Sequence, residues 1–414
     1  MLQLIQLLQS INYDVIFASP AAKGDHCVDL EKWHVVSQSI ALNCSSFDDW
    51  LSTVMPDLVM FDRFMMEEQF SWRVDKVCPD AIKLLDSEDL HFLRHARHEA
   101  LKQAAKKTSE PVINSPVFQQ LPFNAGNVYE NGLQNDMALR EIASIYRCDL
   151  TLTISRVEID ILTTQFNIPA QQLCYCPFLI SGEEPADSPD FETRHGFVTI
   201  GNFRHAPNWD GVLQLKQHVW PLIRKRLPSA TLSIFGAYPP PKATALTDTS
   251  TGFLVKGWAE SATDEMKKAR VCLAPLRFGA GLKGKLVEAM ACGTPSVTTS
   301  IGAEGLAPHT DWSGAVSDEL SSFADAAILL HEDKSTWSAA QRQGFNLLQR
   351  HFNSDEHQNA VITQIQQVVN HRQQHRSANF TGQMLRHHAH RSTQFMSQWI
   401  EAKTKLATVS TNEE

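Results

Sequence analysis

The stretch FGAGLKGKLVEAMACGTPSV, residues 278–297, decides the fold of this chain. It fits two phosphate-binding patterns at once, G-x-G-x-x-G and G-x-x-x-x-G-K. A P-loop requires Ser or Thr after its lysine, and this chain has Leu286 there. Both patterns also belong beside the first strand of their domain, whereas this loop follows a late strand. Neither a P-loop nor a dinucleotide fingerprint is therefore indicated.

The local chemistry of the stretch still suits a bound anion. A strand leads into the glycine-rich turn, and a helix is expected from about Lys283 to Cys292, ended by Gly293. Glycines let backbone N–H groups approach a ligand, and a helix N-terminus attracts negative charge. Lys283 and Lys285 stand in the first turn, where cations oppose the helix dipole. An anion site is favoured over the alternative, a tight strand-to-helix connection with solvated lysines.

Outward from this stretch, short apolar runs alternate with longer helical patterns along the chain. This rhythm is typical of βαβ units and parallel sheets. Helices include Arg140–Tyr146 and Gly211–Arg226. Strands are expected at Val15–Ala18, Leu58–Phe61, Ala81–Leu85, Leu150–Ile154, Leu173–Cys176, Phe197–Gly201, Ala230–Phe235, Phe253–Val255, Val271–Ala274, Ser296–Thr299 and Ala315–Val316.

The domain organisation follows from an acidic, proline-bearing segment over 181–194, which has almost nothing to bury and indicates a linker. The prediction is an α/β protein with two Rossmann-like domains, 1–180 and 195–375. Residues 376–414 are expected to form a C-terminal helical extension, with a last helix near Gly382–Leu406.

The composition of the chain limits the classes of function that it can have. The chain has 414 residues, 43% of them hydrophobic, and a formal net charge of −9. Nucleic acid is not expected as a partner, because such binding relies on many Lys and Arg residues. Eight scattered cysteines without a C-x-x-C pair indicate reduced thiols in a cytoplasmic protein. No apolar run reaches the roughly 18 residues of a membrane span.

Two long segments carry a resemblance to a known family. PLRFGAGLKGKLVEAMACGTPSVTTSIGAEGL resembles the donor-site segment of family-four glycosyltransferases of the GT-B fold. FVTIGNFRHAPNWDGVLQLKQHVWPLIRKRLPSATLSIFGAYPPP is similar to the start of the same donor domain. A weaker resemblance extends over 57–180. Taken together, the resemblance implies a GT-B fold with a donor/acceptor cleft between the two domains. The glycine-rich turn and the helix N-terminus after it would then bind the diphosphate of a nucleotide sugar.

The resemblance assigns the ribose hydroxyls of the donor to Glu288, the one carboxylate within the helix. The alternative is that Glu288 faces solvent and pairs with Lys285, three residues earlier in the same helix. A second family glutamate, close to the transferred sugar, corresponds to Ala280 in this chain. Backbone N–H groups of Gly279 to Gly281 are the expected substitutes.

The residues expected to supply positive charge to the donor diphosphate also differ from the family pattern. Relatives carry Arg and Lys in the first loop of the donor domain, and Asn202 and Asp210 occupy those positions here. The nearest replacements are Arg204, Lys283 and Lys285, and Gly201 is expected beside the donor as well. Such cations stabilise the charge on the departing nucleoside diphosphate. For Arg204 the alternative is a plain surface residue.

In the first domain, LLDSEDLHFLRHAR follows a strand at its carboxyl end, where open α/β sheets place ligands. The family shows Asp-x-His-Asn or Asp-x-His-Asp there; Asp86 and Asp89 match, and Glu88 stands at the histidine position. These three carboxylates are the candidate catalytic residues, as base or in orienting an acceptor hydroxyl. The alternative is an acidic cluster that favours the helix dipole.

The resemblance implies a retaining, metal-independent transfer from a nucleoside-diphosphate sugar to a hydroxyl of a glycan or lipid-linked acceptor, without a cofactor. Polysaccharide or cell-surface glycan synthesis is the expected setting. A peripheral membrane contact is considered for two helices, the basic helix near 92–107 and the last helix. The alternative is a solvated face for the basic helix and packing on the body of the protein for the last helix. The chain begins in what resembles the first helix of its domain, so the first strand is expected to be missing. The alternatives are a nucleotide-sugar epimerase and a catalytically impaired scaffold.

Overall fold

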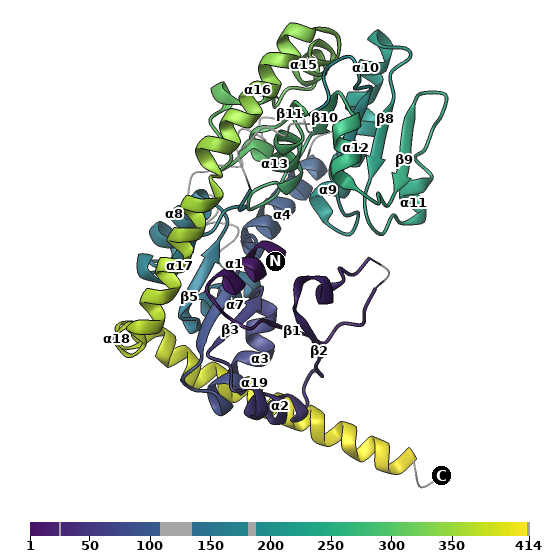
Figure 1. The fold of residues 1–414 in the computed structure, drawn as a ribbon. Helices are drawn as coiled ribbons and strands as arrows, with labels where there is room; N and C mark the ends of the chain where they lie inside the picture. The colour runs from purple at the N-terminus through teal and green to yellow at the C-terminus, as the bar shows by residue number, and fades with distance from the viewer. Residues whose placement is uncertain (25, 108–134, 181–187, 412–414) are drawn as a thin grey trace.

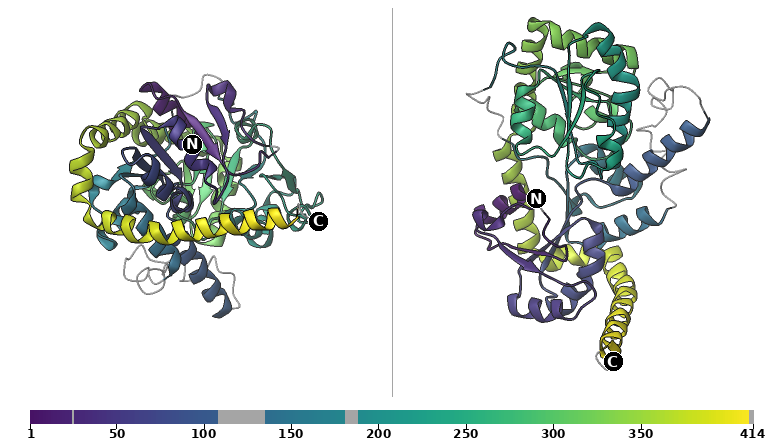
Figure 2. Two further views of the ribbon diagram at one scale, coloured as in Figure 1. Left: turned by 90° about the horizontal axis from the view of Figure 1, so that it is seen from below. Right: turned by 90° about the vertical axis from the view of Figure 1, so that its right-hand side faces the viewer.

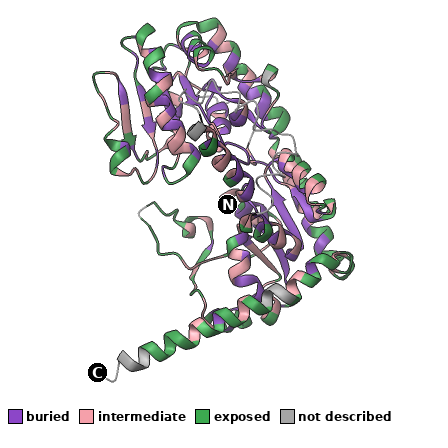
Figure 3. Ribbon diagram, turned by 180° about the vertical axis from the view of Figure 1, so that it is seen from behind, coloured by how far each residue is buried: buried purple, intermediate pink, exposed green. Residues whose placement is uncertain are grey.

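The computed structural model describes residues 1–24, 26–107, 135–180 and 188–411. Two α/β domains lie end to end, and the C-terminal helices run from the second domain back along the first (Figure 1). The views in Figure 2 show α19 (Phe380–Thr411) passing across the first domain and extending beyond it. The strands of both sheets are buried between more exposed helices (Figure 3).

The first domain is built on a parallel sheet of order β3-β4-β5-β6. Its strands are β3 (Leu58–Asp62), β4 (Ile82–Asp86), β5 (Leu150–Thr153) and β6 (Leu173–Tyr175). Its helices include α2 (Ser46–Val54), α3 (Phe64–Val77), α4 (His91–Lys107), α7 (Asp136–Arg147) and α8 (Arg156–Gln165). The central strands β4 and β5 are buried almost throughout, as expected for a parallel sheet covered on both faces, although Lys83, Thr151 and Thr153 interrupt their apolar residues.

The chain's first elements lie beside this sheet. Helix α1 (Leu2–Ser10) buries Leu4, Leu7 and Leu8 in a core cluster with residues of β4, β5 and the C-terminal helix α17 (Ser354–Asn370). Strands β1 (Ile16–Ser19) and β2 (Val36–Ser39) pair with each other in parallel and do not join the four-stranded sheet. The sequence predicted β1 and missed β2, because VSQS is mostly exposed and carries no apolar run.

The second domain is a six-stranded parallel sheet of order β12-β11-β10-β7-β8-β9. Its strands are β7 (Phe197–Ile200), β8 (Leu232–Phe235), β9 (Phe253–Gly257), β10 (Val271–Ala274), β11 (Ser296–Thr298) and β12 (Gly314–Val316). Every one coincides with a predicted strand to within a few residues. The order reverses between β7 and β10, which is where open α/β sheets bind ligands at their carboxyl ends.

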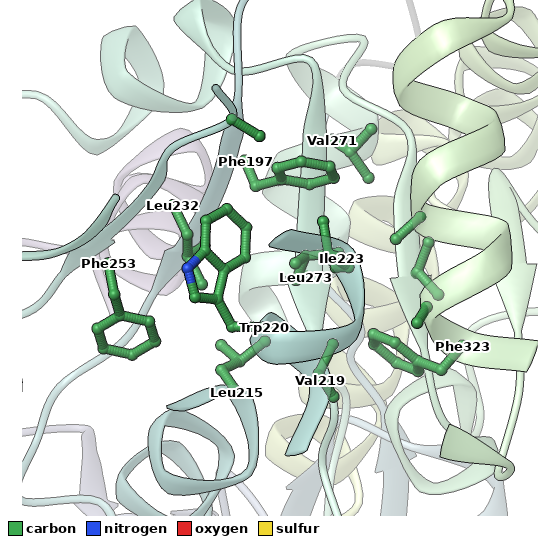
Figure 4. Close-up of a cluster of buried hydrophobic side chains, with 14 of the residues drawn as sticks. Phe197, Leu215, Val219, Trp220, Ile223, Leu232, Phe253, Val271, Leu273 and Phe323 are labelled. Atoms are coloured by element: carbon green, nitrogen blue, oxygen red, sulfur yellow. The ribbon is translucent and has the colours of Figure 1, made fainter. Parts of the chain in front are cut away.

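The core of the second domain lies between the sheet and a long helical stretch. This stretch runs through α9 (Ala206–Gln214), a π-helical turn and α10 (Trp220–Arg226). Trp220 is the centre of the cluster in Figure 4, edge-on to Phe197, and its indole N–H donates to Thr251 O at 2.8 Å. Helix α15 (Leu320–Glu332) closes the cluster with Phe323.

The C-terminal helices attach to the first domain. After α16 (Lys334–His351), α17 (Ser354–Asn370) packs against the first sheet, although the sequence placed its residues in the donor domain. The guanidinium groups of Arg376 and Arg386 then bind Asp149, at 2.7 and 3.2 Å in the closest contacts. Within the described residues, no helix is both long enough and apolar enough to cross a membrane.

Candidate donor and acceptor site

A cavity of about 490 Å³ lies between the two domains. Loops after β4 and β5 contribute from the first domain, and loops after β7 and β10 contribute from the second. Its lining includes the predicted residues Asp86, Glu88, Asp89, Gly201, Gly279, Lys283, Lys285 and Glu288. Two predicted donor residues, Arg204 and Gly281, lie outside the lining.

The glycine-rich turn connects β10 to α13 (Gly284–Ala291) and rests against the first domain. Gly281 has φ +62°, and a Cβ there would lie 2.8 Å from the Cβ of Asp89. Only glycine fits both the left-handed backbone and this close approach. Ala280 packs with the apolar core of the first domain, so the turn itself forms part of the contact between the domains.

The two lysines at the start of α13 differ in their surroundings. The Lys283 ammonium donates to Gly281 O at 2.8 Å and lies 3.5 Å from the Glu304 carboxylate, so its charge is already paired. Lys285 donates to Asn208 Oδ1 at 2.8 Å. Among the described residues it has no carboxylate partner, and burial lowers its pKa from 10.5 to about 8. Lys285 is therefore the cation of the cavity best suited to receive an anion.

Glu288 lines the cavity one turn further along α13. Its carboxylate accepts a long hydrogen bond of 3.4 Å from Thr263 Oγ1, and burial raises its pKa. In the part of the chain that the structure describes, it forms no ion pair with Lys285.

The first loop of the donor domain places its side chains differently from the prediction. Arg204 is exposed, and its guanidinium stacks over the Tyr238 ring at 3.8 Å from the centroid. Gly201 lines the cavity, and a Cβ there would meet the Asn208 side chain at 2.6 Å. Asp210 forms an ion pair with Arg277.

The acidic turn after β4 presents three carboxylates in three different states. Burial raises the pKa of Asp86 to about 6. Glu88 has φ +55° and is half-exposed, and its pKa is raised by burial and by Asp62. Asp89 is paired with Arg94, a cavity residue that the sequence interpretation did not select. Asp86 is therefore the carboxylate best placed to accept a proton near neutral pH.

The acidic turn was alternatively expected to stabilise the dipole of α4, but other residues bind the first N–H groups of this helix. Glu141 accepts hydrogen bonds from the backbone N–H groups of His91 and Phe92 at 3.1 and 2.9 Å. Glu158 accepts from Leu90 N–H at 3.0 Å. The first N–H groups of α4 are thus capped by carboxylates from α7 and α8.

Glu158 is a residue that sequence reasoning missed. Its pattern, Ser155-x-x-Glu158, is that of a capping box, which predicts a local bond to the N-cap residue. In the structure Glu158 Oε1 accepts from Gly281 N–H, across the domain boundary, at 2.7 Å. The N–H of Gly281, expected to be available for the donor, is therefore engaged. The partner lies 123 residues away along the chain, beyond the reach of any local pattern.

Residues 194–333 match the family Glycosyl transferases group 1, and no curated protein sequence matches the chain. Several solved structures have a similar fold. Anabaena HepE with UDP-glucose superposes with a TM-score of 0.61 at 12% identity, covering 88% of this chain and 95% of HepE. Sucrose-phosphate synthase from Thermosynechococcus elongatus gives 0.60 at 14% identity, over 88% and 92%. TarM gives 0.56 at 11% identity over 77% of this chain, which spans only 57% of TarM.

The architecture defines the chain as a protein of the GT-B fold. Within that fold, the second domain carries the match to Glycosyl transferases group 1, over residues 194–333. The expected fold class is confirmed, while the resemblance to family four stays a prediction.

Proposed function

We propose that the protein transfers a sugar from a uridine-diphosphate sugar to a hydroxyl group of an acceptor bound in the cavity between its domains. The observation that carries this proposal is the position of Lys285, a cation without a carboxylate partner in the described chain, at the N-terminus of α13. UDP is favoured over other nucleotides because structures of similar fold contain it, in HepE and in the pneumococcal O-GlcNAc transferase GtfA.

The donor diphosphate would lie against Gly201, Gly279 and the first turn of α13. Lys285 and the helix N-terminus would stabilise the charge that develops on the departing UDP. Glu288 would accept hydrogen bonds from the ribose hydroxyls. Lys283 would act indirectly, because its ammonium group already binds Gly281 O and Glu304.

The acceptor hydroxyl would approach from the first domain. A bond forms between its oxygen and the anomeric carbon as the bond from that carbon to the phosphate oxygen breaks. Asp86 would take the hydroxyl proton or orient the hydroxyl, and its pKa of about 6 leaves it mostly ionised at neutral pH. Glu88 and Asp89 would shape the acceptor side. Retention of configuration and independence from metal follow from the family resemblance.

The acceptor is a glycan or a lipid-linked glycan, in polysaccharide or surface-glycan synthesis in the cytoplasm. Helix α19 offers a surface for peripheral membrane contact. One face packs on the first domain, where Ser397 binds Arg73 and Glu401 binds Ser45. The other face exposes four large apolar side chains with Lys403 beside them: Phe395, Met396, Trp399 and Leu406, 59–72% exposed. Such a face suits the interface of a bilayer.

The test is calorimetric titration with UDP, GDP, ADP and their sugar conjugates, followed by product analysis. Binding of UDP compounds that is weakened by Lys285→Ala and Glu288→Ala would support the donor site. Arg204→Ala is the matched comparison, and it should bind as the wild type does because Arg204 lies outside the cavity lining. A folded protein that binds none of these nucleotides would contradict the proposal and favour the scaffold alternative. An epimerised nucleotide sugar, formed without acceptor, would identify an epimerase.

A further inference from the structure

Glu158 carries a buried carboxyl group at the junction of the two domains. It stands in the first turn of α8, is 1% exposed and forms no ion pair among the described residues. Burying a carboxylate without a cation is costly unless hydrogen bonds satisfy it. The two bonds to Oε1 come from backbone N–H groups, one from each domain, while Oε2 has no partner in the described structure.

These two N–H groups belong to the two halves of the proposed site. Leu90 directly follows the acidic turn that carries Asp86, Glu88 and Asp89. Gly281 lies in the turn that leads to Lys285. One carboxylate oxygen thus holds the acceptor side and the donor side at the same point.

The glycine-rich turn is fixed on its other side by a second interdomain contact. Arg97 of α4 donates to Gly279 O at 2.7 Å and binds both oxygens of Glu304 at 2.8 Å. Between the two anchors, Ala280 packs in the core of the first domain. The turn is thereby bound to the first domain through Gly279 and Gly281.

We propose that Glu158 is a positioning residue that holds the glycine-rich turn before α13 (the donor turn, with Gly279 and Gly281) against the acidic turn before α4 (the acceptor turn, with Asp86, Glu88 and Asp89). It thereby sets the approach of the acceptor to the donor sugar. Its effect on transfer rests on the proposed function, whereas its effect on the turn does not. Transfer is sensitive to this placement, because a misplacement of about 1 Å can reduce a rate by about a hundredfold.

Three variants separate this role from general stability. Glu158→Asp keeps the carboxylate but withdraws it by one methylene, Glu158→Gln keeps an acceptor oxygen in place, and Glu141→Ala is the matched control. Glu141 caps the same end of α4 and is equally buried, but its two backbone bonds stay within the first domain.

The first readout is amide hydrogen exchange in the full-length protein. Glu158→Asp should speed exchange at Gly281 and Leu90 by about tenfold or more, while Glu158→Gln should stay close to the wild type. Glu141→Ala should speed exchange at His91 and Phe92 and leave Gly281 unchanged. Wild-type exchange at Gly281 in folded Glu158→Asp would overturn the proposal, and so would faster exchange there in Glu141→Ala.

The second readout is the steady-state rate with UDP-sugar and acceptor. Glu158→Asp should lower kcat by about 10- to 100-fold with a small change in KM for the donor. Glu158→Gln should retain most of the activity. Equal losses of kcat in Glu158→Asp and Glu141→Ala would refute a specific positioning role. If the wild type transfers no sugar at all, the proposed function fails, and the exchange experiment still decides whether Glu158 holds the turn.

Discussion

Replacing Lys285 by Met should stabilise the free protein while weakening nucleotide binding. The ammonium group is partly buried and donates to Asn208 Oδ1, and burial lowers its pKa from 10.5 to about 8. A shift of this size corresponds to about 3 kcal/mol of free energy spent on keeping the group charged at neutral pH. Methionine preserves the stem and removes the charge, so the free energy of unfolding at pH 7 should rise by roughly 2–3 kcal/mol.

The sign of the pH dependence follows from the same shift. Between pH 8 and 10.5 the unfolded chain binds a proton at Lys285 that the folded protein has lost, so wild-type stability rises with pH in this window. The Lys285→Met variant should lack this rise. Urea unfolding at pH 7, 8, 9 and 10, with and without UDP, measures both effects.

Nucleotide binding should change in the opposite direction. A charge-assisted hydrogen bond to phosphate is worth about 2–3 kcal/mol, so Kd for UDP should rise by about 30- to 150-fold. UDP at a hundred times the wild-type Kd stabilises the wild type by about 2.7 kcal/mol and should stabilise the variant by less than about 1 kcal/mol. Lys334→Met, at an exposed pair with Glu192, is the control and should change neither quantity. A destabilised Lys285→Met variant with wild-type UDP affinity would refute the reasoning.

Three further predictions concern other parts of the molecule. Asp86→Asn should lower the transfer rate by about 10²–10⁴-fold, and the wild-type rate should rise with pH through about 6, where Asp86 ionises; a pH profile unchanged in the variant would exclude Asp86 as the base. Burial, with Asp89 nearby and Lys283 partly opposing, raises the pKa of Glu158 to about 8, so the folded protein retains a proton that the unfolded chain loses above about pH 4.5. Wild-type stability in urea should therefore fall relative to Glu158→Gln, by up to about 1.4 kcal/mol per pH unit between pH 5 and 8; equal slopes would contradict this. Phe395→Ser with Trp399→Ser should reduce sedimentation with anionic liposomes without lowering Tm, whereas loss of a dimer in the variant would point to a second copy as the occupant of this face.

The sequence predicted the strands of the two main sheets well, because buried parallel strands appear in a sequence as short, mostly apolar runs. Strand β10 was predicted at its observed bounds, since VCLA is buried on both faces. The pair β1–β2 shows the opposite case, because an exposed strand leaves no apolar signal. The return of α17 to the first domain was also hidden: amphipathic spacing tells which face is buried, but not which domain covers it.

The same distinction governs the site. Lys285 and Glu288 follow the glycine-rich turn within one helix, so local sequence was enough to place them on one wall of the cavity. Glu158 binds the N–H of Gly281, 123 residues away, and no spacing rule connects the two; Arg94 pairs with Asp89 in the turn just before its own helix, a contact that the sequence interpretation did not select.

The contact between the domains explains why such residues matter for the proposed transfer. The donor turn and the acceptor turn are separated by almost 200 residues along the chain. In the structure the donor turn has no freedom of its own: Gly279 is held by Arg97, Gly281 by Glu158, and Ala280 by the core of the first domain. A larger residue at Gly281 would push Asp89 away and open the cavity. The geometry between donor and acceptor therefore depends on backbone contacts at this turn, and changes there should alter kcat before they alter nucleotide affinity.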